Sequence, residues 1–105
     1  MAGKFICNEC NDKSIVISKS MELGPDDQSD ERSLQSINCL NCDFQGIALY
    51  EESRRGGSDS FRHYGYKVSK SVFEVMFEAI NYNNKSINLD SIKKNSDYFP
   101  LKLGV

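Results

Sequence analysis

The residues best suited to chemistry in this sequence are four cysteines arranged in two closely spaced pairs. Cys7 and Cys10 form the first pair, Cys39 and Cys42 form the second, and two residues separate the members of each pair. This spacing lets one tight turn present two thiolates on adjacent corners of a tetrahedron, the geometry that zinc prefers. Four thiolates leave no coordination position for water, so the pattern predicts one structural zinc ion and no catalytic metal.

Other states of these cysteines have to be weighed against zinc. Iron in a rubredoxin-like site would use the same four thiolates, and the spacing does not distinguish the two metals. A redox pair of the thioredoxin type is expected near a βαβ pattern, which this sequence lacks. Buried free thiols are the remaining alternative. The duplicated spacing therefore favours a single structural zinc ion, with iron as its competitor.

The composition predicts a small soluble protein with one modest core. The chain has 105 residues, 39% of them hydrophobic, and a formal net charge of −2. So short a chain buries a limited core, so a metal that cross-links it contributes a large share of its stability. We expect no signal peptide and no membrane-spanning segment, because no apolar run approaches about 18 to 20 residues. We therefore predict a cytoplasmic protein, where paired cysteines bind metals more often than they form disulfides.

Strand patterns surround both cysteine pairs. Residues 14–23 and about 32–38 show the alternation of a half-buried strand, and residues 43–51 follow the second pair as a third strand. Residues 24–30 are rich in Gly, Pro, Asp and Ser, which predicts an exposed hairpin tip. The predicted fold class is small α+β, with a zinc ribbon of antiparallel β hairpins and two zinc knuckles, followed by a C-terminal helix.

The last third of the chain predicts that helix. Ser69 suits an N-cap, and apolar residues recur at helical spacing from Val72 to Tyr82. The apolar stripe is wider than one packed face needs, so a homodimer is an open alternative. We expect a short second helix over residues 89–95 and an irregular tail over residues 97–101.

These elements divide the chain into two predicted domains. Residues 1–68 form the zinc-ribbon β domain with its long acidic hairpin tip and basic loop. Residues 69–105 form the C-terminal helix and the irregular tail packed on it.

Residues 4–50 resemble a zinc ribbon of the transcription-factor type, in the order strand, CxxC, long hairpin, CxxC, strand. The resemblance implies a metal-stiffened module that binds other macromolecules. The sequence bears a weaker resemblance to the ribbon of the transcript-cleavage elongation factors, which carries an Asp-Glu pair at its hairpin tip. Asp30 and Glu31 stand close to the place of that pair, but the arginine-containing segment of that family is absent. The alternative is an ordinary solvated acidic loop.

A basic and aromatic segment follows the ribbon. The candidate residues for binding nucleic acid or another partner are Arg54, Arg55, Arg62, Tyr64, Lys67 and Lys70. Cationic side chains can neutralise phosphates, and aromatic faces can stack on bases. The competing interpretation places the aromatic side chains in the core and the arginines on an ordinary surface. His63 lacks a recognisable catalytic partner in the sequence and is predicted to be a surface or partly packed ring.

Together these patterns favour a zinc-binding adaptor or regulatory protein that engages nucleic acid or a nucleic-acid-handling complex. The alternatives are a protein-only interaction module that regulates a larger enzyme, and an elongation-factor-like accessory to RNA polymerase. We expect no enzymatic activity, because the sequence contains no phosphate loop, HExxH, nucleophile elbow or dinucleotide fingerprint. The net acidity favours a protein partner, whereas the local excess of basic residues favours nucleic acid.

Overall fold

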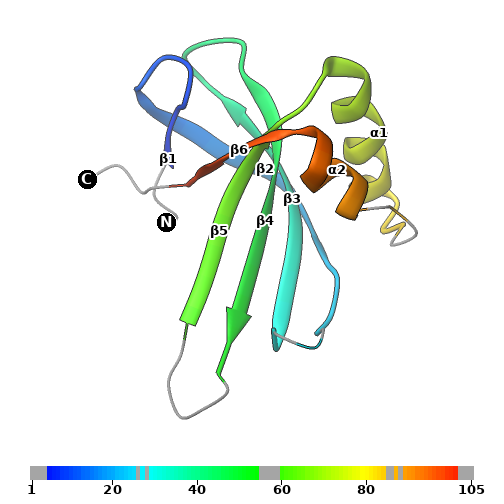
Figure 1. Cartoon of the computed structure of the whole chain (residues 1–105). Helices are drawn as coiled ribbons and strands as arrows, with labels where there is room; N and C mark the ends of the chain where they lie inside the picture. Colours follow the sequence, from blue (N-terminus) through cyan, green and yellow to red (C-terminus); the bar gives the residue numbers. More distant parts are fainter. Residues whose placement is uncertain are drawn as a thin grey trace.

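A computed structural model describes residues 5–25, 27, 29–54, 60–84, 87 and 89–101. These residues form a curled antiparallel sheet of six strands that lie in sequence order, with two helices packed beside it (Figure 1). The strands are β1 (Phe5–Ile6), β2 (Lys13–Glu22), β3 (Glu31–Cys39), β4 (Gln45–Ser53), β5 (Ser60–Lys67) and β6 (Asp97–Pro100). The helices are α1 (Lys70–Asn81) and α2 (Leu89–Asn95), between β5 and β6. The predicted α+β class is confirmed.

Helix α1 covers one face of the sheet. The Oγ atom of Ser69 accepts a hydrogen bond from the backbone N–H of Val72 at 3.3 Å, so Ser69 is the N-cap as predicted. Met76 and Ile80, one turn apart, are buried on the sheet side of the helix. The sheet residues in the same core cluster are Met21, Leu34, Ile47, Leu49 and Tyr66. No helix among the described residues is long and apolar enough to cross a membrane.

A second core cluster contains cysteines of both pairs. Its buried members are Cys7, Ile15, Ile37, Cys39, Phe44, Ala48, Phe99 and Leu101. Because this cluster and the α1 cluster cover the two faces of the sheet, both inward and outward side chains of central β3 are buried from Leu34 to Ile37. The cysteines are therefore part of a hydrophobic core and not an appendage to it.

The prediction of an irregular tail over residues 97–101 is wrong. Strand β6 pairs antiparallel with β5, and the N–H of Leu101 extends the ladder by donating to the carbonyl of His63 at 3.0 Å. A four-residue strand that ends in proline carries little local signal, and proline is tolerated here because β6 is an edge strand. The pairing joins the second predicted domain to the sheet of the first.

Gly65 is needed where β5 meets β6. It lies directly opposite Phe99, whose ring covers the glycine. A Cβ atom at this position would lie 2.6 Å from the Phe99 Cζ atom. Packing the ring here therefore requires a residue without a side chain.

We predict that Gly65→Ala lowers the free energy of unfolding by about 1 to 3 kcal/mol, because the added methyl group overpacks this contact. Chemical denaturation of the metal-loaded protein measures the change. In the double variant Gly65→Ala/Phe99→Leu the shorter leucine side chain relieves the clash. The stability lost in the double variant should therefore be smaller than the sum of the losses in the two single variants Gly65→Ala and Phe99→Leu. Strictly additive losses would show that the ring does not impose the glycine.

Candidate metal centre

The two cysteine pairs lie on two turns at the same end of the sheet. The first turn joins β1 to β2 and the second joins β3 to β4 (Figure 1). Strand register brings the turns together, because Ile15 of β2 pairs with Phe5 on one side and with Cys39 on the other. Cys7 and Cys39 are buried, whereas Cys10 and Cys42 are half-buried.

The four sulfur atoms are spaced as one metal ion requires. All four lie within 4.8 Å of one another, and the Sγ–Sγ distances are 3.7 Å for Cys7–Cys42 and 3.7 Å for Cys10–Cys39. Thiolates about 2.3 Å from a tetrahedral zinc ion would lie about 3.8 Å apart. A disulfide would need about 2.05 Å, and the cysteines are free. The residues therefore fit one metal ion held by Cys7, Cys10, Cys39 and Cys42 and are compatible with structural zinc.

Backbone amides of both turns point at the sulfur atoms. The N–H of Glu9 donates to the Sγ atom of Cys7 at 3.4 Å. In the second turn, the N–H groups of Asn41 and Cys42 both donate to Cys39 Sγ at 3.3 Å. Asn11 closes the first turn in the left-handed region with φ of 62°, a conformation that asparagine tolerates better than most residues. These turns thus stabilise negative charge on sulfur.

Two polar side chains that the cysteine spacing did not reveal also contact the sulfur atoms. The hydroxyl of Ser14 lies 3.0 Å from Cys39 Sγ, and the side-chain amide of Asn41 donates to Cys10 Sγ at 3.6 Å. Asn41 stands between Cys39 and Cys42 in the sequence, so its place beside the sulfur atoms could have been predicted. Ser14 could not, because it reaches Cys39 only through the pairing of β2 with β3.

The surroundings of Cys39 and Cys42 shift the pKa values of their thiols in opposite directions. Burial raises the pKa of Cys39, but hydrogen bonds from Ser14, Cys42 and Asn41 outweigh it and lower this pKa to about 6. At Cys42 a backbone hydrogen bond involving Phe44 lowers the pKa, but burial and the neighbouring thiols raise it to about 12. Four ionised sulfurs at this spacing need a cation between them, which is the electrostatic basis for metal binding.

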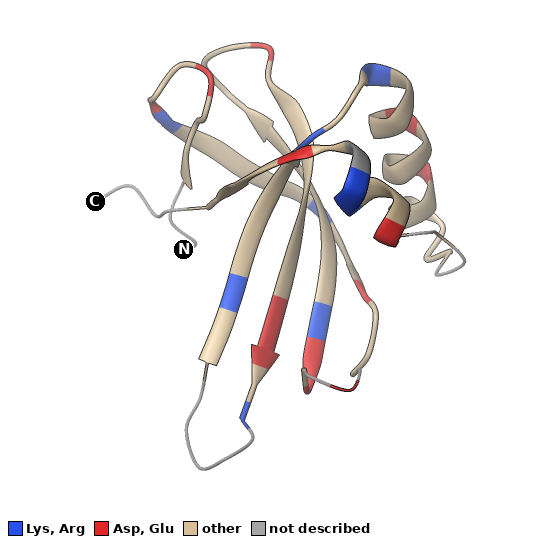
Figure 2. Cartoon of the chain, in the orientation of Figure 1, with Lys and Arg blue, Asp and Glu red and all other residues tan. Residues whose placement is uncertain are grey.

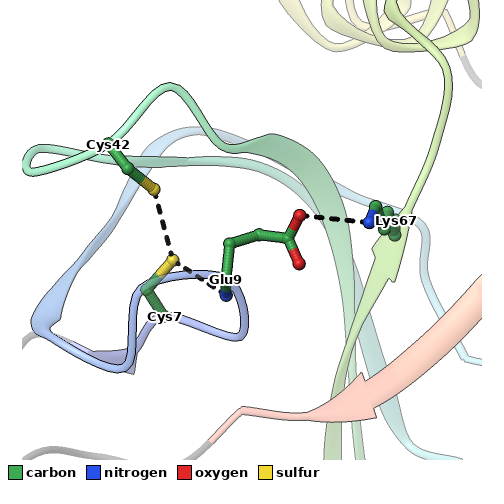
Figure 3. Close-up of polar contacts among 4 residues, drawn as sticks. All are labelled: Cys7, Glu9, Cys42 and Lys67. Carbon is green, nitrogen blue, oxygen red and sulfur yellow. Dashed lines mark hydrogen bonds and ion pairs between the residues drawn. The ribbon is translucent and has the colours of Figure 1, made fainter.

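An ion pair connects the first turn to the end of β5. Lys67 Nζ lies 3.0 Å from Glu9 Oε1, and Glu9 is the same residue whose N–H donates to Cys7 (Figure 3). Because Lys67 precedes α1 by three positions, this contact ties the metal turn to the segment that leads into the helix. Lys67 was predicted as a contact residue for nucleic acid or a partner, and the structure places it beside the metal centre.

Acidic and basic residues lie together at the end of the sheet remote from the cysteines (Figure 2), where the acidic tip contacts the basic residue that follows β4. The carboxylate of Asp30 accepts a hydrogen bond from the backbone N–H of Arg54 at 2.6 Å. The Arg54 guanidinium lies 3.1 Å from Glu31 and 3.6 Å from Glu52. Two surfaces that the sequence suggested separately therefore form one mixed cluster. Arg55, the next predicted contact residue, lies outside the described residues.

The other predicted contact residues do not share one surface with Lys67. Alternation along β5 places Arg62 and Tyr64 on the sheet face that α1 covers, whereas Lys67 belongs to the opposite face. Arg62 lies 3.6 Å from Glu51, and half-buried Tyr64 packs edge-on to the Tyr98 ring at 5.6 Å. Lys70 is exposed at the first position of α1.

No protein-family model matches the sequence, and comparisons with curated proteins and with solved structures also found no match. The four-cysteine cluster is compatible with a zinc-ribbon-like site. Membership of the transcription-factor ribbons, and of the transcript-cleavage factors among them, stays a prediction from sequence.

We predict that Cys39→Ser abolishes stoichiometric zinc binding and largely unfolds residues 1–50, because the ion and the core cluster lose the same buried residue. Metal analysis after desalting measures the first effect, and amide NMR dispersion measures the second. A Cys39→Ser protein that is folded without metal would contradict the assignment.

We also predict that Ser14→Ala weakens zinc binding by about tenfold, the usual effect of removing a side chain that orients a metal ligand. Competition with a chromophoric chelator measures the affinity. Ser20→Ala is the matched control, since Ser20 is an exposed serine of the same strand. Equal affinity for the Ser14 and Ser20 variants would remove Ser14 from the metal centre.

Proposed function

We propose that this protein is a zinc-stabilised protein-interaction module whose metal serves structure. The observation that carries the proposal is that three of the five cations that sequence reasoning assigned to nucleic acid lie against carboxylates. Arg54 lies against Glu31 and Glu52, Arg62 against Glu51, and Lys67 against Glu9. Each pair is partly exposed and individually weak. Their combined effect is that carboxylates stand where phosphates would have to approach.

A structural role for the metal follows from its proposed ligands. Four cysteine sulfurs complete a tetrahedron and leave no position for a substrate or for water. The ion would therefore fix the two turns relative to one another and supply no Lewis-acid chemistry. We accordingly propose that the protein is not an enzyme.

Nucleic-acid binding is the second candidate. Phe61 favours it, because this aromatic residue is 69% exposed and lies opposite Glu52, which Arg54 contacts. An exposed ring beside a cation is a recurrent element of single-strand binding surfaces. The elongation-factor-like alternative is less well supported, because Asp30 and Glu31 would first have to part from Arg54.

Binding experiments with nucleic acid and with protein partners distinguish the two candidate functions. We predict that the zinc-loaded protein shows no binding to labelled single- or double-stranded DNA or RNA in anisotropy titrations at low and high salt. We further predict that it retains a protein partner on affinity purification that the metal-free Cys39→Ser variant does not retain. Nucleic-acid binding that weakens steeply with salt and is lost in Arg54→Ala/Arg62→Ala would overturn the proposal in favour of the second candidate.

A further inference from the structure

The sheet face opposite α1 carries a group of aromatic and acidic side chains at the end remote from the cysteines. Cross-strand register places them in two adjacent rows. Glu22, Ser33, Tyr50 and His63 lie side by side across β2, β3, β4 and β5. Glu31, Glu52 and Phe61 form the next row. Directly paired residues point to the same face, so these rows form one surface, which we call the aromatic–acidic face.

The rings of this face contact one another in a continuous series. Tyr50 stacks on Phe61 with ring centroids 6.2 Å apart, and it meets His63 edge-on at 5.4 Å. His63 in turn meets Phe5 edge-on at 5.1 Å. Gln35 Oε1 lies 2.7 Å from His63 Nε2, which fixes the imidazole in the series. Because the rings hold one another in place, a ligand would lose little entropy in ordering them.

The described residues of this face carry predominantly negative charges. Glu31 and Glu52 lie directly opposite one another, an arrangement that like charges disfavour. Arg54 contacts both, and Glu22 adds a third carboxylate in the neighbouring row, so among the described residues of the two rows carboxylates outnumber this one cation. Burial raises the pKa of Tyr50, and Glu52 and Glu31 raise it further, so the negative field reaches the rings. Such a surface attracts cations and repels phosphates.

We propose that the aromatic–acidic face binds an extended, arginine-containing peptide segment of a partner protein. This proposal rests on the protein-interaction function proposed above and names the surface and the chemistry of its partner. A guanidinium group can stack on an exposed ring such as Phe61 and at the same time donate two hydrogen bonds to a carboxylate such as Glu52. An ammonium group can do this less well, because it is a compact charge without a planar face.

The spacing of the two rows also fits an extended segment. Tyr50 and Glu52 stand two residues apart on β4, so the rows are separated by the repeat that places alternate side chains of an extended chain on one side. A segment lying along the strands could therefore address both rows with alternate residues. Exposed Phe61 lies at the end of the row that also contains Glu31 and Glu52, beside the carboxylates that would hold the guanidinium.

Anisotropy titrations of the zinc-loaded full chain with short labelled peptides test the proposal. A peptide of alternating arginine and glycine should bind, the matched lysine–glycine peptide should bind more weakly, and the glutamate–glycine peptide should not bind. Phe61→Ala and Glu52→Gln should each weaken arginine-peptide binding by about two- to fivefold, the range expected for exposed cation–π and ionic contacts. Tyr82→Ala is the matched control, because Tyr82 is 77% exposed at the C-cap of α1.

The outcomes separate this surface from the function on which it rests. Equal weakening by Phe61→Ala and Tyr82→Ala, or no weakening by either Phe61→Ala or Glu52→Gln, would overturn the assignment of the face. Binding of single-stranded RNA in place of the arginine peptide, lost in Phe61→Ala, would also overturn it and would assign the face to nucleic acid. If the Phe61→Ala protein still retains a protein partner in a zinc-dependent manner, the aromatic–acidic face is not the binding surface, but the proposed interaction function stands.

Discussion

The structure depends most on the close approach of four cysteine sulfurs at one end of the sheet. Sulfur atoms within 4.8 Å of one another cannot all be thiolates without a cation among them. Two of these residues, Cys7 and Cys39, are also buried in the hydrophobic cluster that contains Ile15 and Ile37. Metal binding is therefore coupled to core packing and to the register of β2 with β3. Without a metal ion, charged or protonated sulfur would stand in the core.

The consequences of this centre extend along the sheet. Glu9 connects the first turn to Lys67 at the end of β5, three positions before α1, so this ion pair ties the metal turn to the segment that leads into the helix (Figure 3). Each of strands β3 and β4 has one end next to the metal centre and its other end in the aromatic–acidic face. An ion bound at one end would thus hold the strands that present Tyr50 and Glu52 at the other. A sheet held in this way would present the proposed interaction surface rigidly.

Local sequence patterns predicted the elements well and their long-range relations poorly. The CxxC spacing predicted the four cysteines that the fold brings together, and Ser69 with the periodic residues after it predicted α1. Strand β6 was not predicted, because it is stabilised by pairing with β5 and by the packing of Phe99 over Gly65, and neither contact can be deduced from the local sequence. The basic and aromatic segment appeared to form one surface. Strand alternation instead separates Arg62 and Tyr64 from Lys67, and Arg54 contacts Glu31 in the neighbouring strand β3.

X-ray absorption spectroscopy of the purified, metal-loaded protein tests the central claim most directly. The energy of the absorption edge identifies the metal, and the scattering around it counts the ligands. We predict a zinc edge with four sulfur neighbours at about 2.3 Å and no nitrogen or oxygen in the first shell. Fewer than four sulfur neighbours, or a bound water or nitrogen ligand, would contradict a closed structural site at Cys7, Cys10, Cys39 and Cys42.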